Sequence, residues 1–462
     1  MENLDRLKDA LYHPNPNIRR RAIEDLSEKG IAAVPILVTA LRDEFPDIRQ
    51  KTATALGKIA HPSAIQSLIP ILGDTDADVR REVMKALRRM GGEARDQLIT
   101  ALNHTSRIVR AASAYLLGDI GDNYAVNFLI AALVDQYDQV RKQAALALGK
   151  IGDTAAINPL IDSLSDPSYV VQDAVSTALK QIGEPAVNAL IKALDDYDWV
   201  RRMNAAIALG QTADVKALEP LIEAVTDPQE MVRQAAVESL GMLSNPRAVS
   251  PLIQALKDHV QAVRALAAHA LGQIGEPAAV PALIEVTQDP SSDVRAYVAL
   301  ALGEITDRRG VMALLQMLHD RSEDVRAQAA FSLGRTRSKD AVQALIQLLR
   351  DNDPQVRGYA LAALGEIGDP SSIPSLVSQL QSPDEALADL AVSALVKIGD
   401  PAIGPVQPYL RHSDVTVRER AQAVLSQIKP APTAQKREPT VPRTGGLINA
   451  IRKVTGNLLK KD

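Results

Sequence analysis

The sequence lacks cysteine altogether over its 462 residues. This absence excludes disulfide bonds, thiolate nucleophiles and zinc sites built on cysteine. Aromatic residues make up only 3% of the chain, so Ala and Leu must fill most of any core. No uninterrupted apolar run approaches about 18–20 residues, so we expect no transmembrane helix. The first residues include acids and no long apolar run, and we therefore expect a cytoplasmic protein without a secretory signal.

A strong charge of one sign is also missing. The chain has 52 Lys and Arg against 56 Asp and Glu, which gives a formal net charge of −4. This balance argues against a nucleic-acid footprint that covers the whole chain. Length alone suggests about three domains, although internal repeats would overturn that count.

Leucine recurs through the chain at intervals of 30 or 31 residues. The leucine column consists of Leu26, Leu56, Leu87, Leu117, Leu148, Leu179, Leu209, Leu240, Leu271, Leu302, Leu333, Leu364, Leu395 and Leu425. Self-similarity at a fixed period of this length is the signature of a repeat protein. We therefore interpret the chain as one array of repeats and not as separate globular domains.

Two more columns keep the same phase. Seven residues before each leucine, twelve of the fourteen positions are arginine, and only Gln172 and Ala388 depart from this. The residue after each leucine is glycine in nine repeats, as at Gly57, Gly149 and Gly272. Alanine fills a further column three residues after the arginine, as at Ala144. Small residues on one helix face allow neighbouring backbones to approach closely, so they predict regular stacking.

Each repeat has the pattern of two helices. The first is short and amphipathic, as in Pro251-Leu-Ile-Gln-Ala-Leu256, and proline often opens it. A turn with Asp or Pro follows, and the second helix runs like Val140 to Gly152. Gly-Asp or Gly-Glu-Pro then ends the second helix, which is typical helix-stop chemistry.

These repeats resemble HEAT repeats of the short type, about thirty residues long, found in phycobilin-lyase and related bacterial proteins. The resemblance covers residues 1–429 and depends on the turn Asp, the Val-Arg pair and the Ala-Ala-x-Ala-Leu-Gly-x-Ile-Gly run. It implies an all-α fold, a right-handed α-solenoid of about fourteen helix pairs. It also implies a structural ladder between the turn Asp and the column Arg. By this resemblance we expect ion pairs from Asp47, Asp78, Asp138, Asp293 and Asp324.

Catalytic and metal-binding motifs are sparse. None of the seven histidines is followed by Glu and no two lie four residues apart, so the di-iron motif of HEAT hydroxylases is missing. There is no phosphate-binding glycine loop and no Gly-x-Ser-x-Gly elbow. The acidic runs 135–138 and 195–198 fall in equivalent turns, where solvated helix capping is the simpler interpretation. We therefore predict no catalytic residues, no metal and no cofactor. Phycobilin-lyase activity, which the resemblance allows, remains the alternative.

The second helices should line the concave face of such a solenoid. Positions two, five and nine after the arginine column should then point outward from the stack. In repeats nine to twelve they form a predicted partner-binding stripe of Leu266, His269, Tyr297, Leu300, Phe331 and Tyr359. Exposed aromatic side chains on a solenoid are typical of protein-binding sites. The alternative is that some of these side chains turn inward and pack.

Basic residues crowd the same face in the first repeats. They are Arg20, Arg21, Lys51, Arg81, Lys85, Arg88 and Arg89. This cluster could meet an acidic surface, but no aromatic residues alternate with it as they would in a nucleic-acid site. We favour a solvated or locally paired face and do not expect nucleic acid as a partner.

The composition changes at Lys429. Residues 430–446 are rich in Pro, Thr and Gly and predict a disordered linker. Residues 447–462 return to a helical pattern, with Leu447, Ile451, Val454 and Leu458 on one face and Arg452 and Lys453 among the basic residues. From Lys429 onward eight basic residues face two acidic ones, a net of +6 that leaves −10 for the preceding residues. A basic amphipathic helix of this kind indicates contact with a membrane surface, a partner groove or the chain's own acidic body.

The sequence therefore predicts a non-catalytic scaffold or adaptor. A protein partner would bind along the concave face and the tail would add a second contact, to a partner or at the periphery of a membrane. A role in phycobilisome biology, as a bilin lyase or a phycobiliprotein-handling factor, is the alternative.

Overall fold

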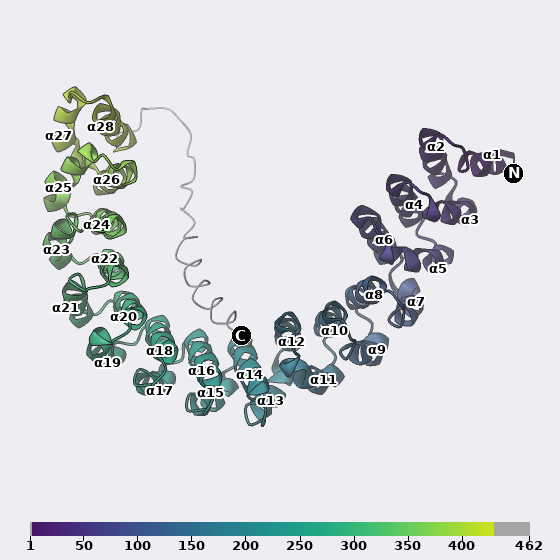
Figure 1. The fold of residues 1–462 in the computed structure, drawn as a ribbon, viewed down its shortest axis with the longest axis horizontal. Helices are drawn as coiled ribbons and strands as arrows, with labels where there is room; N and C mark the ends of the chain where they lie inside the picture. Colours follow the sequence, from purple (N-terminus) through teal and green to yellow (C-terminus); the bar gives the residue numbers. More distant parts are fainter. Residues whose placement is uncertain (1, 429–462) are drawn as a thin grey trace. The chain divides into compact units, whose positions relative to one another are not determined.

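The computed structural model describes residues 2–428, and every regular element in that range is helical. Helices alternate between a first and a second helix of each repeat, as Figure 1 shows. The all-α solenoid of about fourteen helix pairs predicted from the sequence is therefore confirmed. We number the repeats by their second helices, so α2 closes repeat one and α28 closes repeat fourteen.

The second helices are the longer members of each pair. They are α2 (Pro16–Ser27), α4 (Pro46–Ile59), α6 (Ala77–Met90), α8 (Arg107–Ile120), α10 (Asp138–Ile151), α12 (Tyr169–Ile182), α14 (Trp199–Thr212), α16 (Glu230–Leu243), α18 (Gln261–Ile274), α20 (Ser292–Ile305), α22 (Glu323–Thr336), α24 (Pro354–Ile367), α26 (Glu385–Ile398) and α28 (Val415–Ile428).

The first helices are shorter, and 3₁₀ turns extend most of them. They are α1 (Glu2–Ala10), α3 (Val34–Leu37), α5 (Ile65–Leu68), α7 (Arg95–Ala101), α9 (Val126–Ala132), α11 (Ile157–Asp162), α13 (Glu184–Ala193), α15 (Leu218–Ala224), α17 (Val249–Ala255), α19 (Val280–Glu285), α21 (Arg308–Met317), α23 (Val342–Leu348), α25 (Ile373–Ser378) and α27 (Ile403–Val406).

The contacts divide the chain into two compact units, Met1–Ala344 and Leu345–Asp462. The division falls inside α23 and so interrupts a repeat. Within the first unit the second helices lie on the inner side of the curve and the first helices on the outer side (Figure 1). The predicted domain boundaries at 430–446 and 447–462 lie outside the described residues and stay predictions.

The helix ends follow the expected chemistry. The Asp353 carboxylate caps α24 by accepting from the backbone N–H groups of Gln355 and Val356, at 2.8 and 3.0 Å. Such a cap satisfies donors that have no partner within the helix. Gly152 ends α10 in the left-handed region with φ 76°, as its place after the periodic residues predicted. At the end of α22 the same conformation falls on Arg337, with φ 51°.

The leucine column forms the core. Thirteen of its fourteen members are buried, and Leu425, in the last described helix, is only partly so. Column alanines such as Ala144 and Ala267 are fully buried beside them. The pattern predicted from spacing alone is therefore the packing pattern of the solenoid.

The glycine column sets how closely adjacent second helices approach. A Cβ added to Gly149 would lie 2.5 Å from the Cα of Ala178 in the next repeat. Four junctions lack this glycine and carry Ser27, Arg88, Lys180 or Val396 instead. At the last three of these, the helix pairs α6–α8, α12–α14 and α26–α28 contact each other less than the glycine-containing pair α8–α10 does.

Candidate partner-binding surfaces

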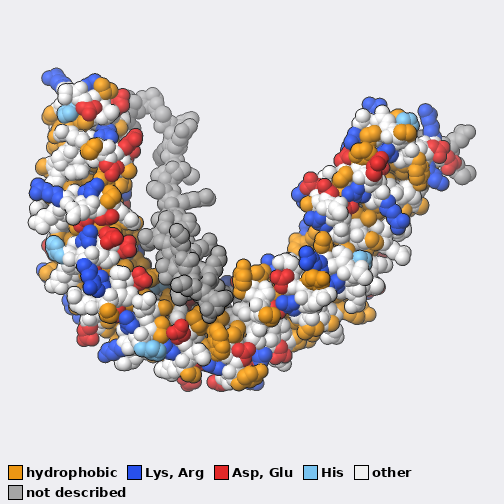
Figure 2. Space-filling view, in the orientation of Figure 1, with side chains coloured by type: hydrophobic (Ala, Val, Ile, Leu, Met, Phe, Trp, Pro, Cys, Tyr) orange, Lys and Arg blue, Asp and Glu red, His pale blue; other side chains and the backbone are white. Residues whose placement is uncertain are grey.

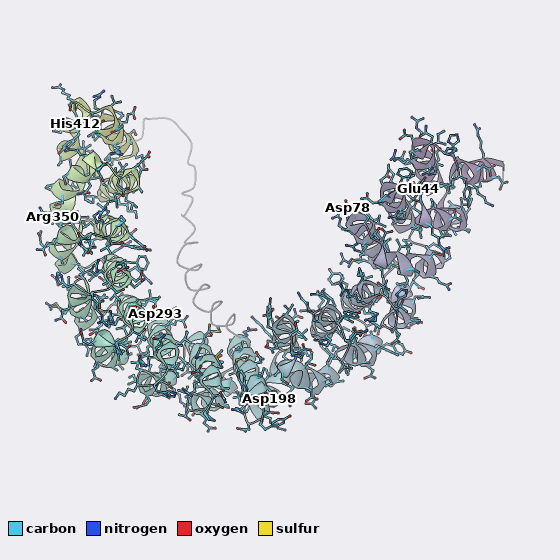
Figure 3. All side chains as sticks on the ribbon, in the orientation of Figure 1. Glu44, Asp78, Asp198, Asp293, Arg350 and His412 are labelled. Atoms are coloured by element: carbon cyan, nitrogen blue, oxygen red, sulfur yellow. The ribbon has the colours of Figure 1, made fainter. Side chains whose placement is uncertain are left out.

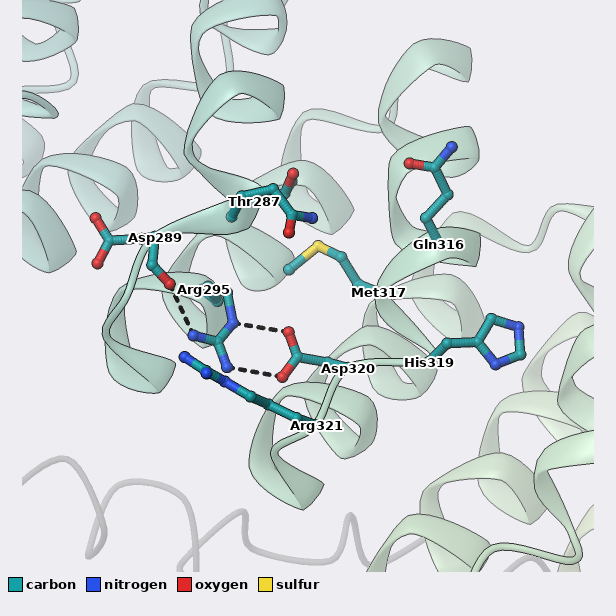
Figure 4. Close-up of a pocket in the computed structure, with 9 residues that line it drawn as sticks. Thr287, Asp289, Arg295, Gln316, Met317, His319, Asp320 and Arg321 are labelled. Carbon is teal, nitrogen blue, oxygen red and sulfur yellow. Dashed lines mark hydrogen bonds and ion pairs between the residues drawn. The ribbon is translucent and has the colours of Figure 1, made fainter.

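The arginine column forms a ladder of ion pairs along the inter-helix turns. The Arg295 guanidinium donates to both carboxylate oxygens of Asp320 in the next repeat, from Nε at 2.7 Å and from Nη2 at 2.8 Å. Its Nη1 donates to the backbone carbonyl of Asp289 in its own repeat, at 2.7 Å. Figure 4 shows this rung, which lines a polar cavity of about 370 Å³. Each such arginine therefore fixes its own turn and holds the next one.

The same geometry recurs through the first unit. The pairs are Arg19–Asp43, Arg49–Asp74, Arg110–Asp135, Arg141–Asp166, Arg202–Asp227, Arg233–Asp258, Arg264–Asp289 and Arg295–Asp320. The ladder expected from the HEAT resemblance is present, and its arginines are structural.

The expected pairing with Arg of the same or an adjacent repeat holds for Asp47 and Asp78 but is wrong for Asp138, Asp293 and Asp324, and none of the five is a ladder residue. The ladder carboxylate stands six residues before each column arginine, where the first helix ends, and not directly before it. Asp293, labelled in Figure 3, lies at the start of α20, and neither it nor Asp138 or Asp324 has an ion pair among the described residues. Asp47 and Asp78 do pair, with Arg20 and Arg81, but on a more exposed face. Position in the turn decides which carboxylate faces the neighbouring repeat.

The ladder lowers the pKa of its carboxyl groups. Burial alone would raise the pKa of Asp320, but the hydrogen bonds from Arg295 and from the Ser322 backbone N–H outweigh it. The pKa of Asp320 is therefore held below its usual range. The pKa of Asp258 is lowered against burial in the same way, by Arg233 and the backbone N–H of Val260.

Between repeats three and four Arg80 donates, among the described residues, only to the backbone carbonyls of Asp74 and Thr75, and the ladder is also interrupted between repeats six and seven. Gln172 replaces the arginine there, and its Nε2 donates only to the backbone carbonyl of Asp166, at 2.7 Å. The next ladder carboxylate, Asp196, pairs instead with Arg201 of its own repeat, at 2.8 Å. Asn204 bridges the gap by donating to the Leu164 carbonyl at 2.8 Å and to Gln172 Oε1 at 3.2 Å. This junction is thus tied by neutral hydrogen bonds, whereas the eight junctions named above each have a charged pair.

The six side chains of the predicted stripe are all partly buried. Leu266 and His269 lie on α18, Tyr297 and Leu300 on α20, and Phe331 on α22. Tyr359 lies on α24 in the second unit and is equally half-buried. The stripe is therefore neither a fully exposed patch nor part of the core, and its role as a binding site stays a prediction.

His269 and Tyr297 form the best-defined part of the stripe. Their rings lie 5.6 Å apart in a tilted arrangement, and Gln273 Nε2 is 3.1 Å from His269 Nε2. The buried Nδ1 of His269 has no hydrogen-bond partner among the described residues. Burial, together with Asp293 and Glu238, raises the pKa of Tyr297. The two half-buried rings therefore leave part of their aromatic surface open to a bound chain.

The basic residues of the first repeats are mostly paired. Lys51 binds Glu24, Lys85 binds Glu82, and Arg88 binds Asp119 at 2.5 Å while donating to the Tyr115 hydroxyl at 2.9 Å. Figure 2 shows side chains of both signs interspersed on the visible face of this region. This agrees with the predicted locally paired face.

The sequence analysis missed a row of exposed apolar side chains on the turn edge of repeats five to seven. We call Val134, Tyr137, Tyr169, Tyr197 and Trp199 the turn-edge patch. All five are exposed, from 36% for Tyr137 to 92% for Tyr197. Tyr137 and Tyr197 stand inside the two acidic runs that were interpreted as capping turns. That interpretation holds for Asp198, which caps α14 (Figure 3), but it overlooked the rings between the acids.

Neither a metal cluster nor a spanning helix is evident in the part of the chain that the structure describes. Within residues 2–428, no group of three His, Cys, Asp or Glu side chains is arranged to hold a metal ion. Over the same residues, no helix combines the length and apolar character needed to cross a membrane. The tail residues Leu447, Ile451, Arg452, Lys453, Val454 and Leu458 lie outside the described residues.

The family model for HEAT repeats matches overlapping segments that run from residue 4 to residue 388. The chain belongs to the HEAT-repeat family. A curated relative, the uncharacterized phycocyanin operon protein Z of Pseudanabaena tenuis (strain PCC 7409), is 30% identical over 133 residues. That match covers 27% of this HEAT protein and 65% of the relative, so it spans less than two thirds of the relative's length. It agrees with the short, phycobilin-lyase-like type of repeat identified from the sequence.

Solved structures show the same fold at low identity. Yeast importin-β (Kap95p) is 15% identical with a TM-score of 0.55, and the match covers 94% of this chain and 70% of that one. The Kap95:Nup1 complex matches with the same coverage at 16% identity and a TM-score of 0.56. The complex of CpcE and CpcF of phycocyanin lyase from Nostoc sp. PCC7120 is 23% identical over 53% of this chain and 94% of that one, with a TM-score of only 0.34. These likenesses concern the fold alone.

Proposed function

We propose that this HEAT-repeat protein is a non-catalytic scaffold that binds a protein partner along the inner face of its second helices. The observation that carries the proposal is the run of half-buried side chains His269, Tyr297, Leu300 and Phe331 on the consecutive helices α18, α20 and α22. A partly exposed aromatic side chain held by packed neighbours offers a large contact area at little cost in side-chain entropy. The Kap95:Nup1 likeness supports a protein partner in general terms.

Charge substitution in the stripe tests this function. Tyr297→Asp with Phe331→Asp should abolish capture of the partner found by affinity purification and mass spectrometry, because a carboxylate would face the apolar contact. Helical circular dichroism should stay unchanged. The matched control is Tyr12→Asp, since Tyr12 is exposed and lies far along the chain from the stripe. If the double variant still captures the partner, the stripe is not the binding site.

A second candidate function is the handling of phycobilins or phycobiliproteins. The phycocyanin operon name of the curated relative is what favours it. Mixing the protein with a free bilin should then shift the visible absorbance of the bilin, and an unchanged spectrum would count against this candidate.

The tail is proposed to add a second contact, to a membrane surface or to a partner. Its net charge of +6 from Lys429 onward supports attraction to anionic lipid, roughly 1 kcal/mol per nearby basic residue. Two linked contacts raise the overall affinity even if each is weak. Flotation with anionic liposomes distinguishes a membrane contact from a partner contact when the full chain is compared with a chain that lacks residues 445–462. Equal flotation of both chains would exclude a membrane contact made by the tail.

A further inference from the structure

The turn-edge patch differs from the stripe because its rings are more exposed and belong to a different edge of the solenoid. Tyr197 is 92% exposed, Tyr169 is 77% exposed and Trp199 is 39% exposed. The chain has only one tryptophan, and it stands in this row. Large exposed apolar side chains that stand on the turns of consecutive repeats indicate an interaction site.

The turns that carry the patch are tied to one another. Tyr137 follows ladder residue Asp135 and donates its backbone N–H to that carboxylate at 2.9 Å. Arg141 then links this turn to Asp166 of the next repeat, at 2.6 and 2.8 Å. The Asn204 hydrogen bond to the Leu164 carbonyl joins repeats six and seven. The rings are therefore mounted on a connected edge, one or two to a repeat.

The Tyr137 ring already has cationic side chains close to its face. The guanidinium groups of Arg107 and Arg110 lie 5.1 and 5.5 Å from the centre of the Tyr137 ring. Phe45 and Tyr124 hold guanidinium groups in the same way elsewhere in the first unit. Tyr169, Tyr197 and Trp199 have no such cation from any described residue. Their ring faces are free to accept one, and a cation over an aromatic face contributes about 0.5–2 kcal/mol.

Acidic side chains stand near Tyr169, Tyr197 and Trp199 along the chain, whereas Tyr137 has Arg107 and Arg110 beside it. The Asp162 side chain is 77% exposed and lies 3.8 Å from the nearest guanidinium, that of Arg201. Asp173 and Asp195 are exposed and have no ion pair among the described residues. An occupant with arginine or lysine side chains matches this surface, whereas an acidic one would be repelled.

The spacing of the row favours an extended chain. Stacked helices lie about 8–10 Å apart, so the rings recur at about that interval from repeat to repeat. A polyproline II segment advances about 3.1 Å per residue with three residues per turn, or about 9 Å per turn. One face of such a segment would meet the ring of each successive repeat. Aromatic grooves recognise proline-containing segments in this manner.

We propose that the turn-edge patch binds an extended, proline-containing segment of a protein partner whose arginine side chains lie over Tyr169, Tyr197 and Trp199. The patch deepens the proposed scaffold function by naming the chemistry of one partner. It is independent of the stripe, because none of its residues belongs to α18, α20 or α22.

Trp199 provides the readout, since it is the only tryptophan in the chain. The full-length protein is titrated with a synthetic peptide of repeated Pro-Pro-Arg units while Trp199 emission is recorded. We expect a saturable change in emission. Peptides of Pro-Pro-Glu and Gly-Gly-Arg units test the charge and the extended conformation separately, and both should bind at least about tenfold more weakly.

The double substitution Tyr169→Ser with Tyr197→Ser should weaken binding of the Pro-Pro-Arg peptide about tenfold. Because both side chains are exposed, the fold should not change, and circular dichroism checks this. Tyr12→Ser is the matched control, and Tyr297→Asp in the stripe should leave the titration unchanged. That last result separates failure of the patch from failure of the stripe.

Three results would overturn the proposal. The first is a Trp199 emission that does not respond saturably to the Pro-Pro-Arg peptide. The second is equal binding of the Pro-Pro-Glu or Gly-Gly-Arg peptide, or of the double variant. The third is a change in Trp199 emission, without any peptide, when Arg437 and Arg443 of the full chain are replaced by Glu, because the occupant would then be this chain's own segment.

Discussion

The α8–α10 junction and the α12–α14 junction are built from the same repeat, yet they pack differently. In the first, a Cβ on Gly118 would lie 2.7 Å from the Cα of Ala147, and Arg110 holds Asp135 through two hydrogen bonds. In the second, Lys180 takes the glycine position and Gln172 takes the arginine position. The second pair of helices makes fewer contacts as a result.

This difference shows that two columns of the repeat control how tightly neighbours stack. The stability of a repeat protein is approximately a sum of the intrinsic terms of the repeats and the terms for each interface. A junction that lacks both the glycine and the charged rung is therefore a local weak point. Tyr169, Tyr197 and Trp199 of the turn-edge patch lie on repeats six and seven, which flank the α12–α14 junction.

Acid should have the largest effect, because it acts on every rung at once. The ladder carboxyl groups, such as Asp258, Asp289 and Asp320, have pKa values lowered in the folded chain. Their stabilisation is present above the unfolded pKa of about 4 and is lost as the pH falls through the folded pKa values. We expect the melting temperature to hold between about pH 5 and pH 8 and to fall steeply below about pH 4. A melting temperature that stays constant down to about pH 2 would contradict a stabilising ladder.

Removal of one buried ladder pair should have the second largest effect on stability. Arg295→Ala leaves Asp320 unpaired with its side chain only 11% exposed, and breaking a buried pair costs about 3–5 kcal/mol. The matched control is Lys216→Ala, whose pair with Glu184 has side chains 52% and 74% exposed, so its loss should lower the free energy of unfolding far less. Urea unfolding followed by circular dichroism measures both. Similar losses in the free energy of unfolding would show that a ladder pair stabilises the protein no more than an exposed pair does.

Repair of the broken rung should have the smallest effect. Gln172→Arg would offer Asp196 a guanidinium from the preceding repeat, but Arg201 of its own repeat already holds that carboxylate at 2.8 Å. We expect a gain in the free energy of unfolding of less than about 1 kcal/mol. In an Arg201→Ala background the same substitution should recover most of the stability that Arg201→Ala removes. If it recovers none, the arginine at this position does not reach the next repeat.

Spacing in the sequence was enough to predict the fold. The leucine, alanine and glycine columns each mark a position on one helix face, because regular spacing shows which residues share a face of the helix. The identity of the ladder aspartates was not predictable in this way, since several turns hold more than one acid and only the folded turn decides whether Asp289 or Asp293 faces the rung.

The exposure of the candidate site residues could also not be predicted from the sequence. Tyr297 is half-buried because neighbouring repeats pack around it, and that depends on the spacing of the helices. Tyr197 and Trp199 were overlooked because the search for a binding face followed the second helices only. Their signal was nonetheless present, as aromatic residues at the turns of consecutive repeats in a chain with few aromatics.

The most direct test of the stacking account compares Gly149→Ala with Lys180→Ala in urea unfolding. In an ordinary helix interior, Gly→Ala stabilises by about 0.5–1 kcal/mol. Here the new Cβ would lie 2.5 Å from the Cα of Ala178, so we predict that Gly149→Ala destabilises by about 1–3 kcal/mol while Lys180→Ala changes stability by less than about 0.5 kcal/mol. A stabilised Gly149→Ala protein would contradict the claim that this column sets the spacing of the repeats.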